Sequence, residues 1–488
     1  MSAHFVIIGN GAAGYRAAKA IRRADSDAQV TLITEESYPF YLRRQLGEFL
    51  AGGLTLPELI FQSRNAYRRE RIDLLLGTRV DRVDLGAHEV ILASPTGPYG
   101  PIRVRSQQGS GLNKDRMAGQ SVRYDRLLLA TGTRAVPFYI PGTDLRGVAA
   151  LDTLEEAQAV KPSLGEARQA AILGEGVIGL ALAESLLGRG LRVTQLLRGE
   201  RFWPEMLDEH TGAMVERVLE NAGVVLRRHA APRAIIGAGG RAIGVETTAG
   251  ETVPAELVAV GCRRRPAIAV IQGSGIAVRR GIQVDVALRT SQADIFAAGD
   301  VAEPAGYDEF GEEGAAFCWQ RAWAQGGLAA ATMLDRKAEP AMEAVRVRTA
   351  IFGRDLAVIG RGHLAAQGGV TAEEHHDEPS VFRRLVFDED LLVGAVVFGT
   401  GESVHELSRL VAAHAPRHLV QSTLGLAAPG PAPELLPETF ARHCPICAAE
   451  LVVRGGTAAG AVIRCQVCST DLVVRWDGRR GWLDFRRL

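Results

Sequence analysis

The chain begins with a run of consecutive apolar residues that leads directly into a glycine-rich turn. Residues 5–8 are all apolar, which is typical of a parallel strand covered on both faces. Gly9, Gly11 and Gly14 follow in the spacing G-x-G-x-x-G, and the alanine-rich residues 15–24 favour a helix. This pattern predicts a dinucleotide-binding turn, in which backbone N–H groups at the helix N-terminus meet a pyrophosphate.

A second apolar strand, residues 29–34, ends next to Glu35. In a dinucleotide-binding unit, a carboxylate about 20 residues beyond the glycines accepts hydrogen bonds from ribose hydroxyls. Glycines alone are also compatible with a tight turn that binds no ligand. Glu35 therefore makes the binding interpretation the stronger of the two.

The same pattern returns farther along the chain. Residues 170–173 are apolar, Gly174, Gly176 and Gly179 repeat the glycine spacing, and the residues up to Glu184 favour a helix. The first glycines of the two turns are 165 residues apart. Two such units in one chain predict an α/β protein with two Rossmann-like dinucleotide-binding domains, and the pair is far more specific than either motif alone.

Composition limits the class of protein. A chain of 488 residues is too long for one core and should form several domains. Hydrophobic residues make up 47% and the net charge is zero, so charge gives no reason to expect nucleic acid or a membrane surface as a partner. No segment predicts a membrane span, and the first strand begins where a signal peptide would carry its charged region. We therefore expect a cytoplasmic protein.

Three further segments carry a resemblance to a known family. Arg43 lies in a loop after the second strand, residues 130–134 read Ala-Thr-Gly-Thr-Arg, and residues 290–303 contain Ala-Ala-Gly-Asp. Together with the two glycine turns, they resemble the FAD-dependent, NAD(P)H-using ferredoxin and rubredoxin reductases, with the flavin domain of nitrite reductase closely related. The resemblance covers residues 2–415 and implies FAD in the first glycine unit and NAD(P)H in the second.

The resemblance also implies individual FAD contacts. Arg43 matches an arginine of the family's loop, whereas residues 46–48 replace its Leu-Ser-Lys. Asp300, preceded by Gly299, matches a carboxylate that binds the ribityl chain, where charge-assisted hydrogen bonds to hydroxyls are strong. Trp319 matches a position that contacts the flavin ring; a tryptophan of the core is the alternative.

The loop segment after Glu35 contains no cysteine. Neither the redox disulfide of glutathione reductase relatives nor the single active cysteine of peroxide-type relatives can form there. Electrons that reach a flavin must then leave to an acceptor outside this domain. The sequence accordingly predicts no catalytic residue, because the flavin carries the chemistry.

The second glycine unit departs from the family at two positions. Ala181 stands where a glutamate is common, and Leu197 stands where the family has a ribose-binding glutamate. Arg198 and Arg201 in the same loop can pair with a 2′-phosphate, which favours NADPH over NADH. The alternative is a unit that keeps the fold but binds nicotinamide poorly.

Residues 345–415 resemble the small α/β interface domain of the family. His375 and His376 are expected in an exposed loop of this domain, with solvent exposure favoured over metal binding. The proline-rich residues 419–437 then predict a semi-rigid linker.

Two C-x-x-C pairs follow the linker, separated by 17 residues. This spacing predicts a four-cysteine zinc ribbon, and a rubredoxin-like iron site is the alternative. The predicted metal ligands are Cys444, Cys447, Cys465 and Cys468.

A segment rich in glycine, serine and proline, residues 94–122, predicts a surface loop in the first unit. Its basic residues are a hypothetical docking surface for a small acidic Fe–S carrier, with a merely solvated loop as the alternative. They are Arg103, Arg105, Lys114, Arg116 and the adjoining Arg123.

The predicted fold class is α/β, with two Rossmann-like domains, a small α/β interface domain and a C-terminal zinc ribbon. The predicted boundaries are 1–149 and 257–335 for the FAD-binding domain, 150–256 for the NAD(P)-binding domain, 340–416 for the interface domain, 417–438 for the linker and 439–488 for the ribbon. The predicted cofactor-binding residues are Gly9, Gly11, Ala13, Gly14, Glu35, Arg43, Val80, Ala130, Thr131, Gly132, Arg134, Gly299, Asp300 and Trp319 for FAD, and Gly174, Gly176, Gly179, Arg198, Arg201 and Gly261 for NAD(P)H.

The predicted function is electron transfer from NAD(P)H through FAD to a protein acceptor. The expected partner is a ferredoxin, a rubredoxin or an Fe–S reductase subunit, with no nucleic acid and no membrane span. The expected cofactors are FAD, NAD(P)H and zinc. The alternative is a flavin-binding scaffold or redox sensor with weak NAD(P)H turnover, which docks a partner through its zinc ribbon.

Overall fold

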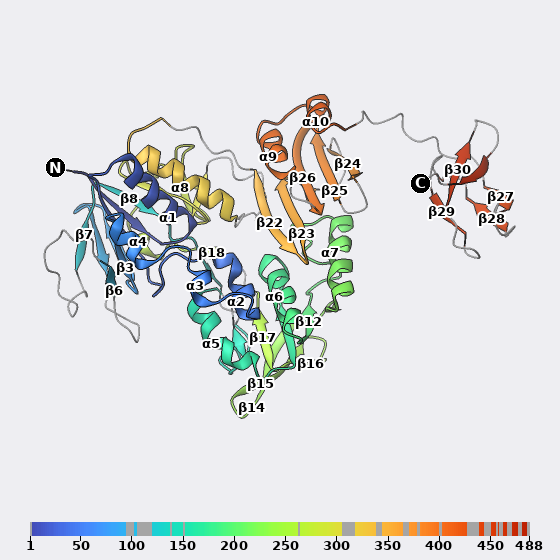
Figure 1. Cartoon of the computed structure of the whole chain (residues 1–488), viewed down its shortest axis with the longest axis horizontal. Coiled ribbons are helices and arrows are strands. Elements are labelled where there is room, and N and C mark those ends of the chain that lie inside the picture. The colour runs from blue at the N-terminus through green and yellow to red at the C-terminus, as the bar shows by residue number, and fades with distance from the viewer. Residues whose placement is uncertain are drawn as a thin grey trace. The chain divides into compact units, whose positions relative to one another are not determined.

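A computed structural model of the chain contains two compact units, Met1–Ala415 and Pro416–Leu488. The structure describes residues 2–93, 102–104, 120–136, 139–149, 152–261, 264–304, 318–337, 344–364, 370–377, 381–399, 403–426, 439–443, 450–454, 457, 462–465, 471–476 and 481–485. Figure 1 shows the elements of each unit along the chain. No helix in the described part of the chain is long and apolar enough to cross a membrane.

The first sheet of the larger unit has the strand order β20-β8-β1-β2-β3-β6. Its strands pair in parallel except β6, which runs antiparallel to β3. The bounds are β1 His4–Ile8, β2 Gln29–Ile33, β3 Asp73–Leu76, β6 Ile102–Val104, β8 Arg126–Leu129 and β20 Ile295–Ala297. The helices α1 (Ala12–Ala24) and α8 (Trp319–Met333) pack against each other beside this sheet.

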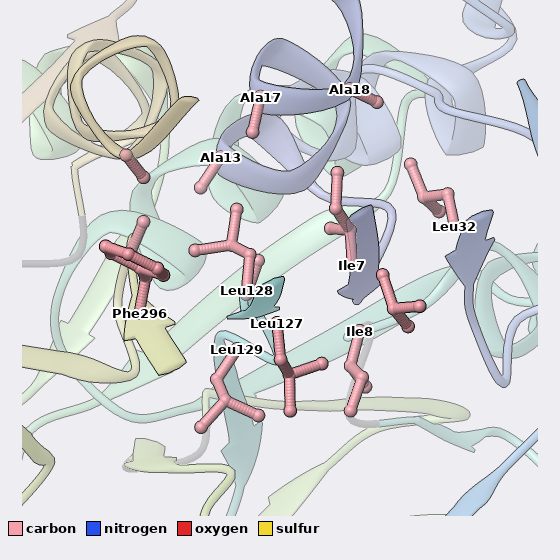
Figure 2. Close-up of a cluster of buried hydrophobic side chains, with 14 of the residues drawn as sticks. Ile7, Ile8, Ala13, Ala17, Ala18, Leu32, Leu127, Leu128, Leu129 and Phe296 are labelled. Atoms are coloured by element: carbon pink, nitrogen blue, oxygen red, sulfur yellow. The ribbon is translucent and has the colours of Figure 1, made fainter. Parts of the chain in front are cut away.

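The apolar residues that predicted the first strand form the core of this layer. Ile7 is fully buried, and Ala17 and Ala18 of α1 are buried with it. Figure 2 shows that α1 presents small alanine side chains to larger side chains of the strands, among them Leu128 and Phe296. Because alanine keeps the helix close to the sheet, the glycine turn that joins β1 to α1 is held at the strand ends.

Smaller elements surround the first sheet. β4, β5 and β7 form an antiparallel sheet, while β9 pairs with β18 and β19 pairs with β21. The bounds are β4 Val80–Asp84, β5 Glu89–Leu92, β7 Ser121–Arg123, β9 Thr133–Ala135, β18 Arg264–Pro266, β19 Ile282–Val284, β21 Ala302–Pro304, η1 Arg43–Gln45, η2 Ala269–Ile271, α2 Leu46–Ala51, α3 Leu56–Leu59 and α4 Arg64–Arg69.

The second sheet repeats the architecture, with the parallel strand order β10-β17-β11-β12-β13. An antiparallel sheet, β14-β15-β16, adjoins it. The bounds are β10 Val148–Ala149, β11 Gln169–Leu173, β12 Arg192–Leu196, β13 Val225–Arg227, β14 Pro232–Ala238, β15 Arg241–Thr247, β16 Thr252–Pro254, β17 Leu257–Val260, α5 Leu154–Leu164, α6 Val177–Gly188 and α7 Glu209–Ala222.

The third sheet is antiparallel, with the order β22-β23-β26-β25-β24 and the helix α9 packed against β23 and β26. The bounds are β22 Val345–Ile351, β23 Arg354–Gly360, β24 Val370–Asp377, β25 Val381–Asp388, β26 Leu391–Gly399 and α9 Val404–Ala412. In the smaller unit, β27 pairs with β28, and β29, β30 and β31 form a sheet. Their bounds are α10 Arg417–Thr423, β27 Phe440–His443, β28 Glu450–Val453, β29 Val462–Arg464, β30 Asp471–Trp476 and β31 Gly481–Phe485.

Several local expectations differ from the structure. The sequence of residues 54–71 predicts a helical segment, and the structure forms it as the two short helices α3 and α4, each started by its own capping residue, Thr55 and Ser63. The sequence of residues 72–83 predicts a short strand pair, and this prediction is wrong, because the two strands formed there, β3 and β4, belong to different sheets. The first part of the expected linker is helical, as α10, and buries Val420.

Candidate functional site

The first glycine turn connects β1 to α1. A Cβ atom at Gly9, which has φ +109°, would lie 2.1 Å from the carbonyl oxygen of Ala130, and one at Gly14 would lie 1.9 Å from the oxygen of Gly9. A Cβ atom at Gly11 would meet nothing within 4 Å. Gly11 is the N-cap of α1 and no side chain caps the helix. The turn therefore leaves backbone N–H groups facing open space, which suits an anionic pyrophosphate.

Glu35 follows β2 of the first sheet, and Arg134 lies in β9, a few residues beyond the end of β8. Arg134 Nη2 donates to both carboxylate oxygens of Glu35, at 2.6 Å each, and both side chains are exposed. The N–H of Gly9 donates to the oxygen of Ile33 at 2.8 Å, which ties the glycine turn to the end of β2. The structure thus brings together the predicted ribose carboxylate and a predicted FAD-site arginine.

Residues 130–132 follow β8 and form a second wall of backbone near the turn. The N–H of Ala130 donates to Ile8 O at 2.8 Å, and Thr131 Oγ1 donates to Ala267 O at 2.8 Å. A Cβ atom at Gly132 would meet nothing within 4 Å. Small residues here leave backbone exposed on the side where a cofactor would lie.

Asp300 carries an unsatisfied buried oxygen. Its Oδ1 is buried without a hydrogen-bond partner among the described residues, and the nearest cation is Arg321 Nη2 at 3.9 Å. Burial raises the pKa of Asp300 above its usual value, although Arg321, Arg264 and Arg43 act in the opposite direction. The N–H of Gly299 donates to Gln325 Oε1 at 2.8 Å, which holds this turn on α8. A buried acceptor without a donor fits the hydroxyl groups of a ribityl chain.

Arg43 is engaged by neighbouring protein groups. Its guanidinium forms an ion pair with Glu36, donates to the carbonyl oxygen of Asp152, and lies 5.4 Å from the ring centroid of Tyr41. The hydroxyl of Tyr41 also donates to Glu36, at 2.5 Å. A flavin contact of Arg43 stays a prediction.

Trp319 begins α8 and is half-buried. Its ring stacks on Trp323 with centroids 4.9 Å apart, and the guanidinium of Arg44 lies 5.6 Å from it. Ala13 of α1 is buried against α8, where a Cβ atom at Gly326 would lie 2.3 Å from the oxygen of Ala13. Val80 is 6% exposed and belongs to the core of the first sheet.

The second glycine turn connects β11 to α6 in the same way. Gly176 has φ +116° and caps α6 without a side-chain hydrogen bond. A Cβ atom at Gly174 would lie 2.6 Å from Gly261 O, and one at Gly179 would lie 3.0 Å from Gly174 O. The N–H of Gly261 donates to Leu173 O at 2.6 Å. The four predicted glycines are therefore gathered around one helix N-terminus.

These features agree with a match to a protein family. Residues 3–326 match the pyridine nucleotide-disulphide oxidoreductase family. The chain belongs to this family. The prediction of an α/β flavoenzyme with FAD and NAD(P)H is thereby confirmed.

Curated relatives of this family member carry names of reductases. The chain is 31% identical over 78% of its length to the ferredoxin--NAD(+) reductase component of a biphenyl dioxygenase system from Paraburkholderia xenovorans, covering 86% of that protein. It is 29% identical over 61% of its length to a rubredoxin-NAD(+) reductase from Pseudomonas putida, covering 71% of it. The predicted function, electron transfer from NAD(P)H through FAD to a protein acceptor, is confirmed at the level of these relatives.

A solved structure supports the fold. A ferredoxin reductase from Rhodopseudomonas palustris superimposes with a TM-score of 0.69 at 23% identity, over 81% of this chain and 91% of that one. The two proteins therefore share the same overall fold over most of both chains.

The loop after β12 contains a contact that the sequence did not reveal. Glu175, between the first two glycines of the second turn, accepts from the N–H of Arg198 at 2.8 Å and from the N–H of Trp203 at 3.1 Å. Trp203 adopts φ +49°, and its ring carbons lie 3.5 Å from the position of a Cβ atom at Gly176. The loop is thus folded onto the turn that should receive a pyrophosphate. The acidic residue between Gly174 and Gly176 was the one feature of the sequence that could have indicated this contact.

Arg198 and Arg201 project from this loop with weak partners. Arg198 Nη2 lies 3.6 Å from Glu205 Oε1, and Arg201 Nη1 lies 4.0 Å from Glu209 Oε2. All four side chains are at least partly exposed, and surface pairs of this kind contribute little to stability. Both guanidinium groups are therefore accessible to an anionic ligand.

The structure describes one of the four cysteines of the predicted metal site. Cys465 is fully buried and packs with Leu472 in a small cluster, whereas Cys444, Cys447 and Cys468 lie outside the described residues. Among the basic residues of the predicted docking loop, Arg105, Lys114 and Arg116 also lie outside them, and Arg103 belongs to β6. Arg123 Nε lies 3.9 Å from Glu89 Oε1.

The expected loop around His375 and His376 is wrong. Both histidines belong to β24, the edge strand of the third sheet, because residues 370–377 pair in register with β25. Alternation along the strand places them on opposite faces. His376 is exposed, whereas His375 is half-buried and lies 3.4 Å from Glu373.

Proposed function

We propose that this enzyme takes a hydride from NAD(P)H onto FAD and passes the electrons singly to a small Fe–S protein such as a ferredoxin or a rubredoxin. Two observations together support this function. Both glycine turns lead into a helix whose N-terminus is not capped by a side chain, and the chain has no cysteine before residue 262. Without a redox disulfide beside the first turn, electrons must leave to an external acceptor. The names of the curated relatives support an Fe–S protein as that acceptor.

The first sheet is the proposed FAD site. Backbone N–H groups after Gly11 bind the pyrophosphate, Glu35 accepts from the ribose hydroxyls, and Asp300 accepts from the ribityl hydroxyls. Arg134 holds the Glu35 carboxylate in position, because Nη2 donates to both of its oxygens. FAD, when bound, supplies hydride acceptance and electron release, and the protein supplies position and electrostatics.

The second sheet is the proposed NAD(P)H site, with Gly176 and the start of α6 as the pyrophosphate position. Arg198 and Arg201 support a preference for NADPH, because an accessible guanidinium pairs with a 2′-phosphate. The predicted domain boundaries belong to the same proposal: 150–256 for this site, and 1–149 with 257–335 for FAD.

Anaerobic titration of the FAD-loaded protein tests this function. We expect NADPH to bleach the flavin absorbance, with NADH acting more slowly, and an added ferredoxin to restore it. The Arg198→Glu variant should lose the preference for NADPH. A flavin that neither nucleotide reduces would contradict the proposal.

One observation favours the alternative, a flavin-binding scaffold with weak turnover. Trp203 lies over Gly176, where a pyrophosphate would have to approach. The titration separates the two functions, because a scaffold would bind FAD normally while its flavin stayed oxidised with either nucleotide.

We further propose that residues 439–488 form a zinc ribbon held by the four cysteines. Support comes from the two C-x-x-C pairs and from the burial of Cys465 between short antiparallel strands. Among the described residues, Cys465 belongs to a small apolar cluster with Leu472, Leu451, Ile463 and Leu483, and a metal would supply much of the folding free energy of so small a unit. Elemental analysis should show that truncation after Pro437 removes one equivalent of zinc. Iron in its place, with thiolate-to-iron absorption, would contradict zinc.

A further inference from the structure

We propose that His210, Glu374 and His376 bind one divalent transition-metal ion, with zinc as the expected occupant, and that this ion joins α7 to the edge strand β24. The potential ligand atoms of the three side chains all lie within 4.8 Å of one another. His210 Nδ1 and Glu374 Oε2 are 3.4 Å apart. The site is independent of the four-cysteine motif and of the proposed flavin chemistry.

Local structure holds the ligand His210 in place. Asp208 caps α7, and its Oδ1 accepts from the N–H of His210 at 3.0 Å and from the N–H of Thr211 at 3.2 Å. His210 therefore stands in the first turn of the helix with a fixed backbone. Its side chain is free to turn toward the strand, since the cap uses only its N–H group.

The other two ligands come from alternate positions of one strand. Glu374 and His376 are separated by one residue in β24, so their side chains leave the same face of the sheet. In the register with β25, Glu374 is opposite Arg384 and His376 is opposite Phe382. His375, between the two ligands, leaves the other face and cannot join them.

Phe382 forms a wall behind both imidazole rings. Its ring stacks on His210 with centroids 5.1 Å apart and planes 8° from parallel, and it lies 5.2 Å from the ring of His376. Phe382 itself is 1% exposed. Stacking on this fixed ring limits the rotation of His210, which lowers the entropy lost when a metal binds, whereas the His376 ring is tilted by 50° to Phe382 and keeps its freedom to turn.

The ligand set suits a borderline metal ion. Zinc binds histidine nitrogen and carboxylate oxygen at roughly 2.0–2.2 Å in a tetrahedron, which places neighbouring ligand atoms roughly 3.3 Å apart. The distance between His210 and Glu374 already has this value, and rotation of the His376 side chain can close the rest. Two imidazoles disfavour Mg²⁺ and Ca²⁺, and the fourth position is left for water.

The charges around the cluster are compatible with a cation. Arg384 is buried and donates to Gly362 O at 2.7 Å and Leu364 O at 2.8 Å. Its Nε lies 3.9 Å from Glu374 Oε1 and 3.9 Å from Asp208 Oδ1. The arginine thus holds one oxygen of Glu374 on the inner side, and the other oxygen, Oε2, faces His210. Asp208 supplies a second negative charge that offsets the guanidinium.

Metal counting on the full-length, FAD-loaded protein tests the proposal. The protein is dialysed against Zn²⁺ and then against metal-free buffer, and zinc is measured per chain. We expect the wild type to retain one equivalent more than the His210→Ala/His376→Ala double variant and the Glu374→Gln variant. Glu374→Gln keeps the shape of the side chain and both histidine rings, so its loss of zinc would report the loss of the carboxylate ligand.

The matched control is His229→Ala, which removes an exposed histidine 2.7 Å from Glu200 in another surface pair. This variant should retain as much zinc as the wild type. Zinc should also raise the Tm of the wild type more than that of Glu374→Gln, because a ligand that binds only the folded state stabilises it. Equal zinc content in wild type and double variant would overturn the proposal. Truncation after Pro437 removes the four-cysteine segment and any zinc bound there. The difference in zinc content between the wild type and the variants at His210, Glu374 and His376 should persist in that truncated background.

Discussion

The carboxylate of Glu175 accepts a hydrogen bond from the backbone N–H of Arg198 at 2.8 Å, so a residue between two glycines holds the loop that follows the next strand. The same carboxylate binds the N–H of Trp203. The loop that should recognise the ribose of NAD(P)H is therefore ordered by the turn that should recognise its pyrophosphate.

Replacement of Glu175 by alanine should weaken NAD(P)H binding. Hydrogen bonds to a charged group contribute about 1.5–3 kcal/mol, so loss of the loop anchor should raise KM for NADPH about tenfold or more. FAD content should stay unchanged, because the first glycine turn is untouched. Steady-state kinetics with an artificial acceptor provide the measurement. An unchanged KM would show that the loop is ordered by other contacts.

Trp203→Ala should have the opposite effect on nicotinamide binding. The ring lies against Gly176 and must move before a pyrophosphate can reach the turn. Its removal abolishes that step, so we expect a lower KM for NADPH and faster flavin reduction in stopped flow. A raised KM would instead show that the indole contacts the bound nucleotide. Tyr139→Ala is a suitable control, because Tyr139 is 88% exposed.

Asp300→Asn should raise the stability of the apoprotein and lower its affinity for FAD. Burial raises the pKa of Asp300, so the folded apoprotein binds a proton more tightly than the unfolded chain and loses stability as pH rises above the unfolded pKa. The amide has no charge, and the variant apoprotein should therefore show a higher Tm at neutral pH than wild-type apoprotein. Its FAD affinity should nevertheless fall, since an amide accepts more weakly from hydroxyls. Asp300→Ala with full FAD affinity would refute the ribityl assignment.

His363 should make the third sheet sensitive to acid. Burial and the nearby Arg346, Arg361 and Arg384 lower its pKa from 6.5 to about 4. Between these two values the unfolded chain binds a proton that the folded protein does not, so stability falls as pH decreases from 6.5 toward 4. His363→Gln cannot take up the proton and should flatten this part of the profile. Thermal unfolding at several pH values measures it, and an unaltered slope in the variant would exclude His363 as the cause.

The local sequence pattern was sufficient to predict the structure of a motif wherever that motif lies within one continuous stretch of chain. Both glycine turns, Glu35 after β2 and the turn at Asp300 depend on residues close in sequence, and the structure forms each strand and helix that they predict. The reason is steric: a backbone approach as close as that at Gly9 admits glycine alone, so the residue type itself marks the geometry.

Residues far apart along the chain required the tertiary structure. The residues next to Arg134 in the sequence do not indicate that its guanidinium donates hydrogen bonds to Glu35. The sequence of residues 72–83 likewise does not indicate that β3 and β4 belong to different sheets. A strand's side-chain period is the same whichever partner it pairs with, so the sequence leaves the partner open.

The cluster of His210, Glu374 and His376 shows the same division. The sequence by itself determined that the chain is an α/β protein with two glycine units and a separate cysteine-rich segment, because each of these features is a pattern of residues close together in the sequence. Only the fold decided that α7 meets β24, since their ligands are separated by 164 residues, from 210 to 374. Side chains from such distant segments acquire a common chemistry only when packing brings them within a few ångströms of one another.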